Sequence, residues 1–149
     1  MSVLNTRMLL KCLNILSKGK VLSSEMSDIL SQWFVEVEGS YFFKILYEKQ
    51  KGHLDKSNFI DKTGFECFVN SFHVDDYTSK EFLEQSLLFA QLVFEKWLIT
   101  NKELILKCII SETNTGVNIR FHIQRTNENW ILDNDLENFE EGVFIMTSK

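Results

Sequence analysis

The stretch LILKCIISETNTGVNIRFHIQ, residues 104–124, changes its hydrophobic pattern twice and decides the fold class. Residues 104–110 are a compact apolar run that suits a buried strand. Residues 111–116 are rich in side chains that favour turns. In residues 117–124 apolar and polar side chains alternate, as in a strand with one buried and one solvent-facing side. The stretch therefore predicts an antiparallel hairpin that joins about 104–110 to 117–125.

The segment before this hairpin has the period of a helix. Apolar side chains in residues 82–98 cover most of a helical circumference, which is typical of a helix buried on more than one side. Residues 78–81 (Thr-Ser-Lys-Glu) have the spacing of a capping box, in which a hydroxyl and a carboxylate bind the first free backbone amides. We expect a helix over about 79–99, ending where the period changes near Asn101, and a last strand at 142–147.

The N-terminal half reads mainly as helical. Residues 3–17 place apolar side chains on one helical face, and a second helix is expected to begin near Ser24. Residues 64–72 follow a second capping-box pattern, formed by Thr63 and Glu66. Because helices come first and antiparallel strands follow, we predict an α+β fold with N-terminal helices packed on a C-terminal antiparallel sheet.

Two stretches between these helices are less regular. Residues 33–48 fit a helical spacing, which is slightly preferred, but residues 34–38 also alternate like a strand and Gly39-Ser40 could turn a hairpin. Residues 49–62 are polar and are expected to form a connecting loop.

Composition fits a single globular domain, residues 1–149, with 44% hydrophobic and 25% charged residues. These values exclude a disordered or collagen-like chain. The cysteines Cys12, Cys67 and Cys108 are far apart and lack the CxxC spacing of a zinc site, so we expect buried thiols in a reducing compartment. The sequence has neither a signal-peptide pattern nor about 18 consecutive apolar residues, so we expect a cytoplasmic protein.

The net charge of −5 is unevenly distributed along the chain. Residues 1–63 hold nine basic and seven acidic side chains, whereas residues 64–149 hold seven basic and fourteen acidic ones. This balance argues against a non-specific binder of nucleic acid or of anionic membranes, and we expect neither as a partner. The acidic half is expected to meet a basic protein.

Residues 129–141 form the most acidic segment, with five carboxylates and no basic residue. Apolar side chains are interleaved with them. An acidic rim around an aromatic anchor is typical of tight complexes with basic proteins, because charge steers the encounter and the buried aromatic slows dissociation. The alternative is a solvated loop whose aromatic side chains pack into the core. The candidate partner-binding residues are Trp130, Asp133, Asp135, Glu137, Glu140 and Glu141, with Asp75 and Asp76 nearby.

Residues 73–76 (His-Val-Asp-Asp) are the best candidate for catalysis or metal binding. One imidazole and two carboxylates in a turn could hold a divalent cation or act as base and acid. The alternative is a loop between helices in which Asp75 and Asp76 help to cap the helix that follows. Cys67 is expected to be a core residue rather than a nucleophile. Because glycine-rich phosphate-binding motifs are also missing from the sequence, we expect no enzyme, no catalytic residue, no metal and no cofactor.

Three segments resemble immunity proteins of bacterial contact-dependent growth inhibition systems. They are GFECFVNSFHVDDY at residues 64–77, NIRFHIQR at 118–125, and the acidic stretch with NW at 129–130 and DLENFEE at 135–141. The resemblance covers roughly residues 60–149 and carries over no functional residue. It implies a small cytoplasmic protein without enzymatic activity that binds and neutralises a cognate toxin domain, often a nuclease.

Other functions remain open alongside an immunity protein. They are a protein-binding regulator outside any toxin system, a nucleic-acid mimic, and a small metal-dependent hydrolase using His73, Asp75 and Asp76. The acidic half agrees with an immunity role because a nuclease must attract phosphates and therefore has a basic cleft. An acidic protein surface presented to that cleft would compete with the phosphates of nucleic acid for its positive charge.

Overall fold

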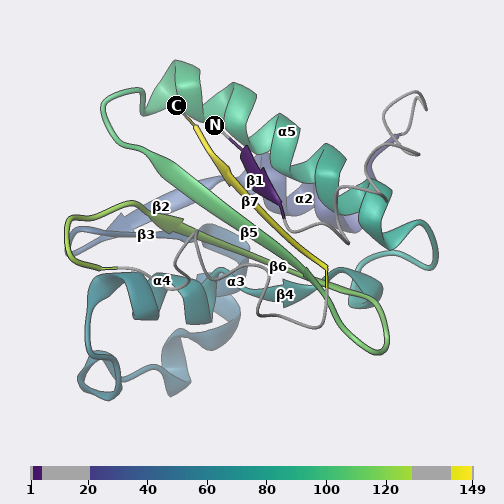
Figure 1. Cartoon of the computed structure of the whole chain (residues 1–149). Helices are drawn as coiled ribbons and strands as arrows, with labels where there is room; N and C mark the ends of the chain where they lie inside the picture. Colours follow the sequence, from purple (N-terminus) through teal and green to yellow (C-terminus); the bar gives the residue numbers. More distant parts are fainter. Residues whose placement is uncertain (1, 5–20, 129–141, 149) are drawn as a thin grey trace.

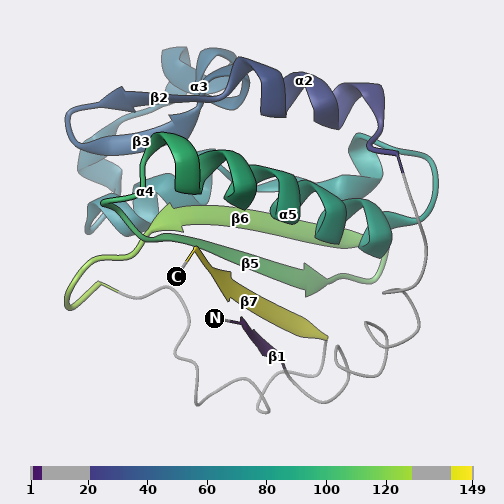
Figure 2. The same ribbon diagram turned by 90° about the horizontal axis from the view of Figure 1, so that it is seen from above.

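The computed structural model of the chain describes residues 2–4, 21–128 and 142–148. Its centre is a five-stranded antiparallel sheet with the strand order β1-β7-β5-β6-β4 (Figure 1). The long helix α5 (Phe82–Thr100) lies across one face of this sheet (Figure 2). The predicted α+β fold is present, with the helices mostly preceding the main strands. These strands are β1 (Ser2–Leu4), β4 (Phe72–His73), β5 (Leu106–Glu112), β6 (Val117–Ile123) and β7 (Val143–Thr147).

The predicted hairpin is confirmed as β5 and β6, which pair antiparallel from Leu106↔Ile123 to Glu112↔Val117. The solvent-facing side predicted for residues 117–124 is wrong, because α4 (Lys62–Val69) packs against β6 and both Asn118 and His122 are buried. The predicted last strand is β7, which pairs with the other edge of β5. Alternate side chains of the sheet point towards α5 and form one buried cluster with it. This cluster includes Cys108, Ile110, Ile119 and Phe121 of the sheet, and Phe89, Val93 and Trp97 of the helix.

The helix predicted over about 79–99 is confirmed as α5, but its start differs. The residue before the helix, Glu81, has a left-handed backbone with φ of 57° and provides no side-chain cap. The hydroxyl of Thr78 donates instead to the carbonyl of Lys80, at 3.3 Å. The capping box predicted for residues 78–81 is therefore wrong, because the chain turns through Glu81 before the helix begins.

Residues 33–48 contain a hairpin followed by a short helix. Strands β2 (Phe34–Val37) and β3 (Ser40–Phe43) are joined by Glu38 and Gly39, whose φ values are 51° and 85°. Positive φ at both turn positions gives a tight hairpin whose twist matches its strands, and glycine adopts this conformation without strain. The slight preference for a helix is therefore wrong over 34–43. Helix α3 spans Lys44–Gln50.

The remaining N-terminal predictions are confirmed in part. Helix α2 (Ser24–Gln32) begins where expected, although the capping hydroxyl is that of Ser23, which accepts from the Met26 amide at 3.3 Å. The expected loop over 49–62 contains the end of α3 and two short 3₁₀ helices, η1 (Lys51–His53) and η2 (Lys56–Asn58).

The chain start forms a strand where a helix is expected. Residues 2–4 pair with β7, so the helix predicted over 3–17 is wrong at its first residues. The rest of that predicted helix lies outside the described residues.

The short helix predicted over about 64–72 is confirmed as α4 (Lys62–Val69), although its ends are shifted and its cap is Asp61, which accepts from the Gly64 amide at 2.7 Å. The second capping box is therefore wrong. Glu66 turns inward instead of back to Thr63, and its side chain is fully buried.

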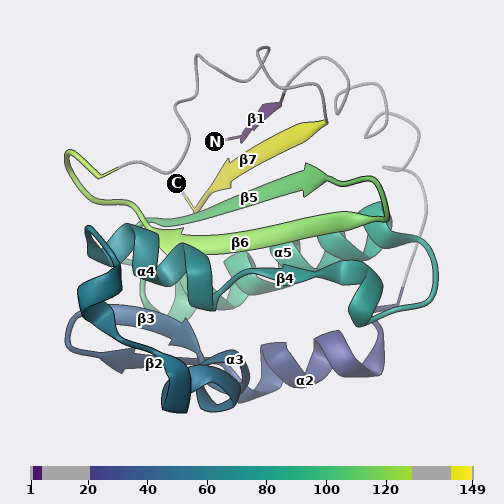
Figure 3. The ribbon, with the colours of Figure 1, turned by 90° about the horizontal axis from the view of Figure 1, so that it is seen from below.

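Helix α4 lies against both β3 and β6 (Figure 3), and its Glu66 carboxylate joins the two sheets. Its Oε2 accepts from the Tyr41 amide of β3 at 2.7 Å, and its Oε1 accepts from the Ile123 amide of β6 at 2.9 Å. Both oxygens also accept from the Arg125 guanidinium, at 2.7 and 2.8 Å. One carboxylate thereby satisfies two backbone amides and one partly buried cation.

Asn70 repeats this arrangement one helical turn later. Its amide nitrogen donates to the carbonyls of Tyr41 (2.8 Å) and Phe121 (3.2 Å), and its oxygen accepts from the Phe43 amide at 2.8 Å. We call Glu66 and Asn70 the α4 clamp. They take the place of a neighbouring strand along the outer edge of β3.

Cys67 and Cys108 are buried free thiols, as predicted for these two cysteines, and Cys12 lies outside the described residues. Burial raises the pKa of Cys67 to about 12, so its thiol stays protonated at neutral pH. Within the described parts of the chain, no helix has the length and apolar character needed to cross a membrane.

Candidate functional site

The structure describes Asp75 and Asp76 among the predicted partner-binding residues. They belong to the 3₁₀ helix η3 (Val74–Asp76), between β4 and α5. The other six lie in residues 129–141, outside the described residues: Trp130, Asp133, Asp135, Glu137, Glu140 and Glu141.

Each residue of η3 has a different environment. Val74 is fully buried and fixes the turn to the core. Asp76 is exposed, whereas Asp75 is half-buried against the turn between β5 and β6. Among the described residues, no side chain caps α5 by a hydrogen bond to its first amides, so the suggested capping role of the two aspartates is not observed.

Asp75 rests on Gly116, and its Oδ1 is buried without a hydrogen-bond partner among the described residues. A Cβ at Gly116 would lie 2.5 Å from this oxygen and 2.8 Å from the carboxyl carbon. The β5–β6 turn thus sets how closely η3 can approach the sheet.

Gly116→Ala is expected to destabilise the fold by about 1–3 kcal/mol, because the added methyl group must displace a half-buried carboxylate. Gly52→Ala is the matched control, since nothing lies within 4 Å of a Cβ there. Urea unfolding followed by circular dichroism measures both variants. Equal midpoints for the two would contradict the close packing of Asp75 on Gly116.

Two shallow grooves of about 500 and 470 Å³ adjoin η3 and share Glu25, Asp76 and Tyr77. The first is also lined by Asp28 of α2, and the second by Asp75. We call the surface formed by Glu25, Asp28, Asp75 and Asp76 around Tyr77 the acidic groove. It brings together carboxylates from segments about fifty residues apart in the sequence.

Hydrogen bonds from three elements fix the geometry of the acidic groove. The Ser23 hydroxyl donates to the Tyr77 carbonyl at 3.0 Å, which ties the start of α2 to the end of η3. Gln85 of α5, which is buried, accepts from the Ser23 amide at 2.8 Å and donates to the Val21 carbonyl at 2.8 Å. The carboxylates of α2 and η3 are therefore held on a rigid frame.

The groove is strongly negative. Lys49 is the cation among its described lining residues, and its ammonium lies 5.5 Å from the centre of the Tyr77 ring. Four carboxylates and one cation thus surround the half-buried side chain of Tyr77. Such a surface attracts basic protein groups by its field and offers Tyr77 as an apolar contact.

Sequence reasoning found Asp75 and Asp76 but missed Glu25 and Asp28. The contact between α2 and η3 depends on Gln85, which is distant from both in the sequence. No local pattern signals this contact.

The alternative metal site is not assembled by the described residues. His73 is exposed at the end of β4, and the two aspartates follow on η3. Across residues 2–4, 21–128 and 142–148, no group of three or more histidine, cysteine, aspartate and glutamate side chains is placed to hold a metal ion.

Comparison with known proteins gives a family for this chain. The family model described as "Uncharacterized protein PM0498 family" matches residues 3–149. The chain is 30% identical over 139 residues to "Uncharacterized protein PM0498" of Pasteurella multocida (strain Pm70), which covers 86% of this chain and 85% of that protein. No solved structure matches the chain. The chain therefore belongs to the PM0498 family.

Proposed function

We propose that this chain is an immunity protein that binds a cognate toxin domain, with a nuclease as the expected toxin class, and neutralises it through an acidic surface. The convergence of Glu25, Asp28, Asp75 and Asp76 in the acidic groove is the observation that carries the proposal. None of these four carboxylates makes an ion pair with another described residue, so their charge is available to a partner.

The acidic segment 129–141 supports the same role by its composition. It adds five carboxylates, among them Asp133, Asp135 and Glu137, and an aromatic anchor in Trp130. A nuclease concentrates positive charge where it binds phosphates. A surface with this density of carboxylates would be drawn to that charge at a rate that depends on ionic strength.

In this proposal the chain acts by occupying the toxin and performs no chemistry of its own. It would work in the cytoplasm, where a nuclease toxin meets nucleic acid. The proposal needs no metal, cofactor, nucleic acid or membrane as partner.

Gene neighbourhood and co-purification test the role directly. An immunity protein is expected to be encoded directly after the C-terminal toxin region of a large secreted protein. Co-expression with that region should yield a stable complex and protect cells. An isolated gene, or a neighbouring toxin that does not co-purify, would favour a regulator outside any toxin system.

Charge-neutral variants test the surface. The change Glu25→Gln/Asp28→Asn/Asp76→Asn, alone or with Asp133→Asn/Asp135→Asn/Glu137→Gln, keeps the side-chain shapes and removes charge. Association with the toxin domain should slow by about tenfold or more and depend less on salt, because steering is lost. The rate is measured by stopped-flow fluorescence at several salt concentrations.

The matched control is Glu48→Gln/Glu95→Gln/Glu103→Gln, which removes the same number of charges from exposed positions outside the groove. This control should change the association rate much less than the groove variant. Equal slowing in both sets would show that net charge matters and that the acidic groove is not the interface.

A further inference from the structure

The two edges of the small β2–β3 sheet are satisfied in different ways. On β3, the α4 clamp binds the outward-facing groups, namely the amide and carbonyl of Tyr41 and the amide of Phe43. Buried side chains thus satisfy this edge where a third strand would otherwise lie. The outer edge of β2 has no such cover among the described residues.

The register shows which backbone groups of β2 point outward. Phe34 pairs with Phe43 and Glu36 with Tyr41. The amides of Phe43 and Tyr41 both donate to the α4 clamp, so these two pairs are the ones without ladder hydrogen bonds. The amides and carbonyls of Phe34 and Glu36 therefore point away from β3.

These outward groups lie at the periphery of the molecule. Figures 2 and 3 show the molecule from opposite sides, and in both views β2 lies farther from the five-stranded sheet than β3 does. None of the described residues makes a hydrogen bond to the backbone amide or carbonyl of Phe34 or Glu36. Proline does not block pairing along this edge, since the chain has none, and Glu36 is the single charged side chain within β2.

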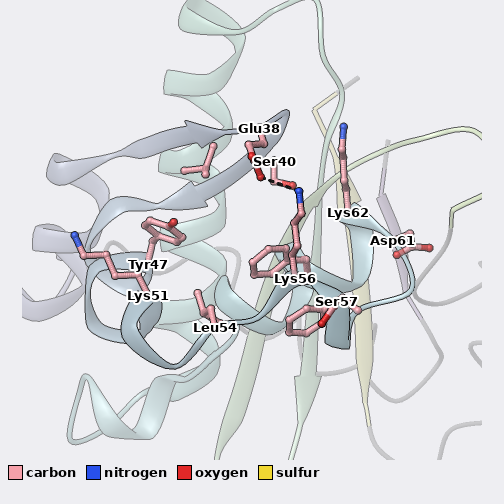
Figure 4. A pocket seen from close by; sticks show the side chains of 12 residues that line it. Glu38, Ser40, Tyr47, Lys51, Leu54, Lys56, Ser57, Asp61 and Lys62 are labelled. Atoms are coloured by element: carbon pink, nitrogen blue, oxygen red, sulfur yellow. Dashed lines mark hydrogen bonds and ion pairs between the residues drawn. The ribbon is translucent and has the colours of Figure 1, made fainter.

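A cleft beside the end of β2 could receive a side chain from an added strand (Figure 4). Its volume is about 520 Å³, and Val37 forms part of its wall. The other apolar walls are the Phe59 and Phe65 rings, which stack 4.6 Å apart, with Tyr47 and Leu54. The polar part of the lining includes Glu38, Asp61 and three lysines, of which Lys56 pairs with Glu38 and Lys51 with Glu48; the third is Lys62. Val37 and Glu36 point to opposite sides of the strand, so an added strand would place alternate side chains in the cleft and opposite Glu36.

We propose that the outer edge of β2 docks an extended, basic segment of the partner protein, which adds a third strand to β2–β3. Main-chain hydrogen bonds to Phe34 and Glu36 provide the affinity, and the cleft beside Val37 accepts an apolar side chain. The exposed Glu36 carboxylate selects a lysine or arginine opposite it, which makes a second copy of this acidic chain an unfavourable occupant. The inference rests on the proposed function, in which this partner is the toxin domain.

Glu36→Pro tests the edge with little effect on the hairpin. Proline removes the outward amide of Glu36, which takes no part in the β2–β3 ladder, and edge strands tolerate proline. Glu36→Thr is the matched control, because it removes the same carboxylate and keeps the amide. Both variants should melt within about 3 °C of each other.

Binding is measured by calorimetry with the purified toxin domain encoded beside the gene. Glu36→Pro should weaken the affinity at least tenfold beyond Glu36→Thr, while Glu36→Thr should mainly slow association. Equal affinities for the two variants, with tight binding by the unmodified chain, would overturn the edge proposal and leave the proposed function standing. Failure of the unmodified chain to bind would overturn both.

Hydrogen exchange in the unmodified chain gives an independent readout if Glu36→Pro does not fold. In the complex, the amides of Phe34 and Glu36 should exchange at least tenfold more slowly than in the free protein. Unchanged exchange at both amides in a saturated complex would overturn the edge proposal.

Discussion

Replacing Glu66 by alanine is expected to lower the free energy of unfolding by about 3–5 kcal/mol, a large share of the stability of one domain. The carboxylate is fully buried and faces the Arg125 guanidinium at 2.7 Å, and the arginine side chain is 16% exposed. Without Glu66, this cation and the amides of Tyr41 and Ile123 lose their acceptor in a dry environment. The melting temperature should fall by about 10 °C.

Glu48→Ala is the matched control. Glu48 also meets a cation at 2.7 Å, that of Lys51, but both side chains are about half exposed. Water replaces an exposed partner, so this variant should unfold at nearly the midpoint of the unmodified chain. The comparison separates the effect of burial from that of ion-pair distance.

A double-mutant cycle isolates the pair. Arg125→Ala alone leaves the buried Glu66 carboxyl without its guanidinium partner, so the double variant should be less destabilised than the sum of the two single variants, by more than about 1 kcal/mol. Guanidinium unfolding at equilibrium measures all four proteins. Additive losses would mean that Glu66 acts through the backbone amides alone.

The sequence predicts elements whose pattern is local. The β5–β6 hairpin follows from strict alternation over 117–123, and α5 follows from its apolar circumference. The sequence does not decide hairpin β2–β3, because aromatic residues in 33–48 satisfy both spacings. The tight turn at Gly39 and the packing of Phe34 on Phe43, with ring centres 4.1 Å apart, decide it in the folded chain.

Long-range contacts account for the wrong predictions. Thr63 and Glu66 have the spacing of a capping box, but Arg125, fifty-nine residues further on, binds the carboxylate in the core. Residues 2–4 form a strand because β7 offers an edge near the other end of the chain. In both cases a tertiary partner outcompetes the local preference.

The sequence predicts only part of the acidic groove, because long-range contacts bring the other carboxylates to it. Asp75 and Asp76 are adjacent, so the sequence shows their combined charge. Glu25 and Asp28 join them through the hydrogen bonds of Gln85 and Ser23. Charges that the fold brings together from distant segments cannot be recognised from the local spacing of residues.

His122 is expected to make the protein less stable as the pH falls from 7 to 4. The imidazole is 1% exposed on β6, on the sheet face opposite α5. Its Nδ1 lies 2.9 Å from the Ile123 carbonyl and donates to it in the neutral tautomer, while Nε2 has no partner among the described residues. Burial lowers the pKa of His122 to about 4, and the nearby charges of Lys107 and Arg125 also lower it, while the hydrogen bond to the Ile123 carbonyl opposes this shift in part.

The sign follows from proton counting. Between pH 6.5 and 4 the unfolded chain binds a proton on His122 that the folded chain does not bind, so acid favours the unfolded state. The contribution of His122 to the stability of the folded state is fully present above pH 6.5 and is lost as the pH falls towards the folded-state pKa. The difference between the pKa of about 6.5 in the unfolded chain and about 4 in the folded chain corresponds to roughly 3 kcal/mol of unfolding free energy.

His122→Asn should remove this pH dependence, since asparagine does not titrate and can still donate to the Ile123 carbonyl. The variant loses some packing at every pH, so the informative quantity is the difference in unfolding free energy between the two proteins. That difference should shrink by roughly 3 kcal/mol from pH 7 to pH 4, because the carboxylates common to both proteins cancel. His53→Asn, at an exposed position on η1, is the matched substitution outside the core. Urea unfolding at constant ionic strength measures the unfolding free energy of the three proteins as a function of pH. A difference between the unmodified chain and His122→Asn that does not change with pH would show that His122 binds its proton equally in the folded and unfolded chain.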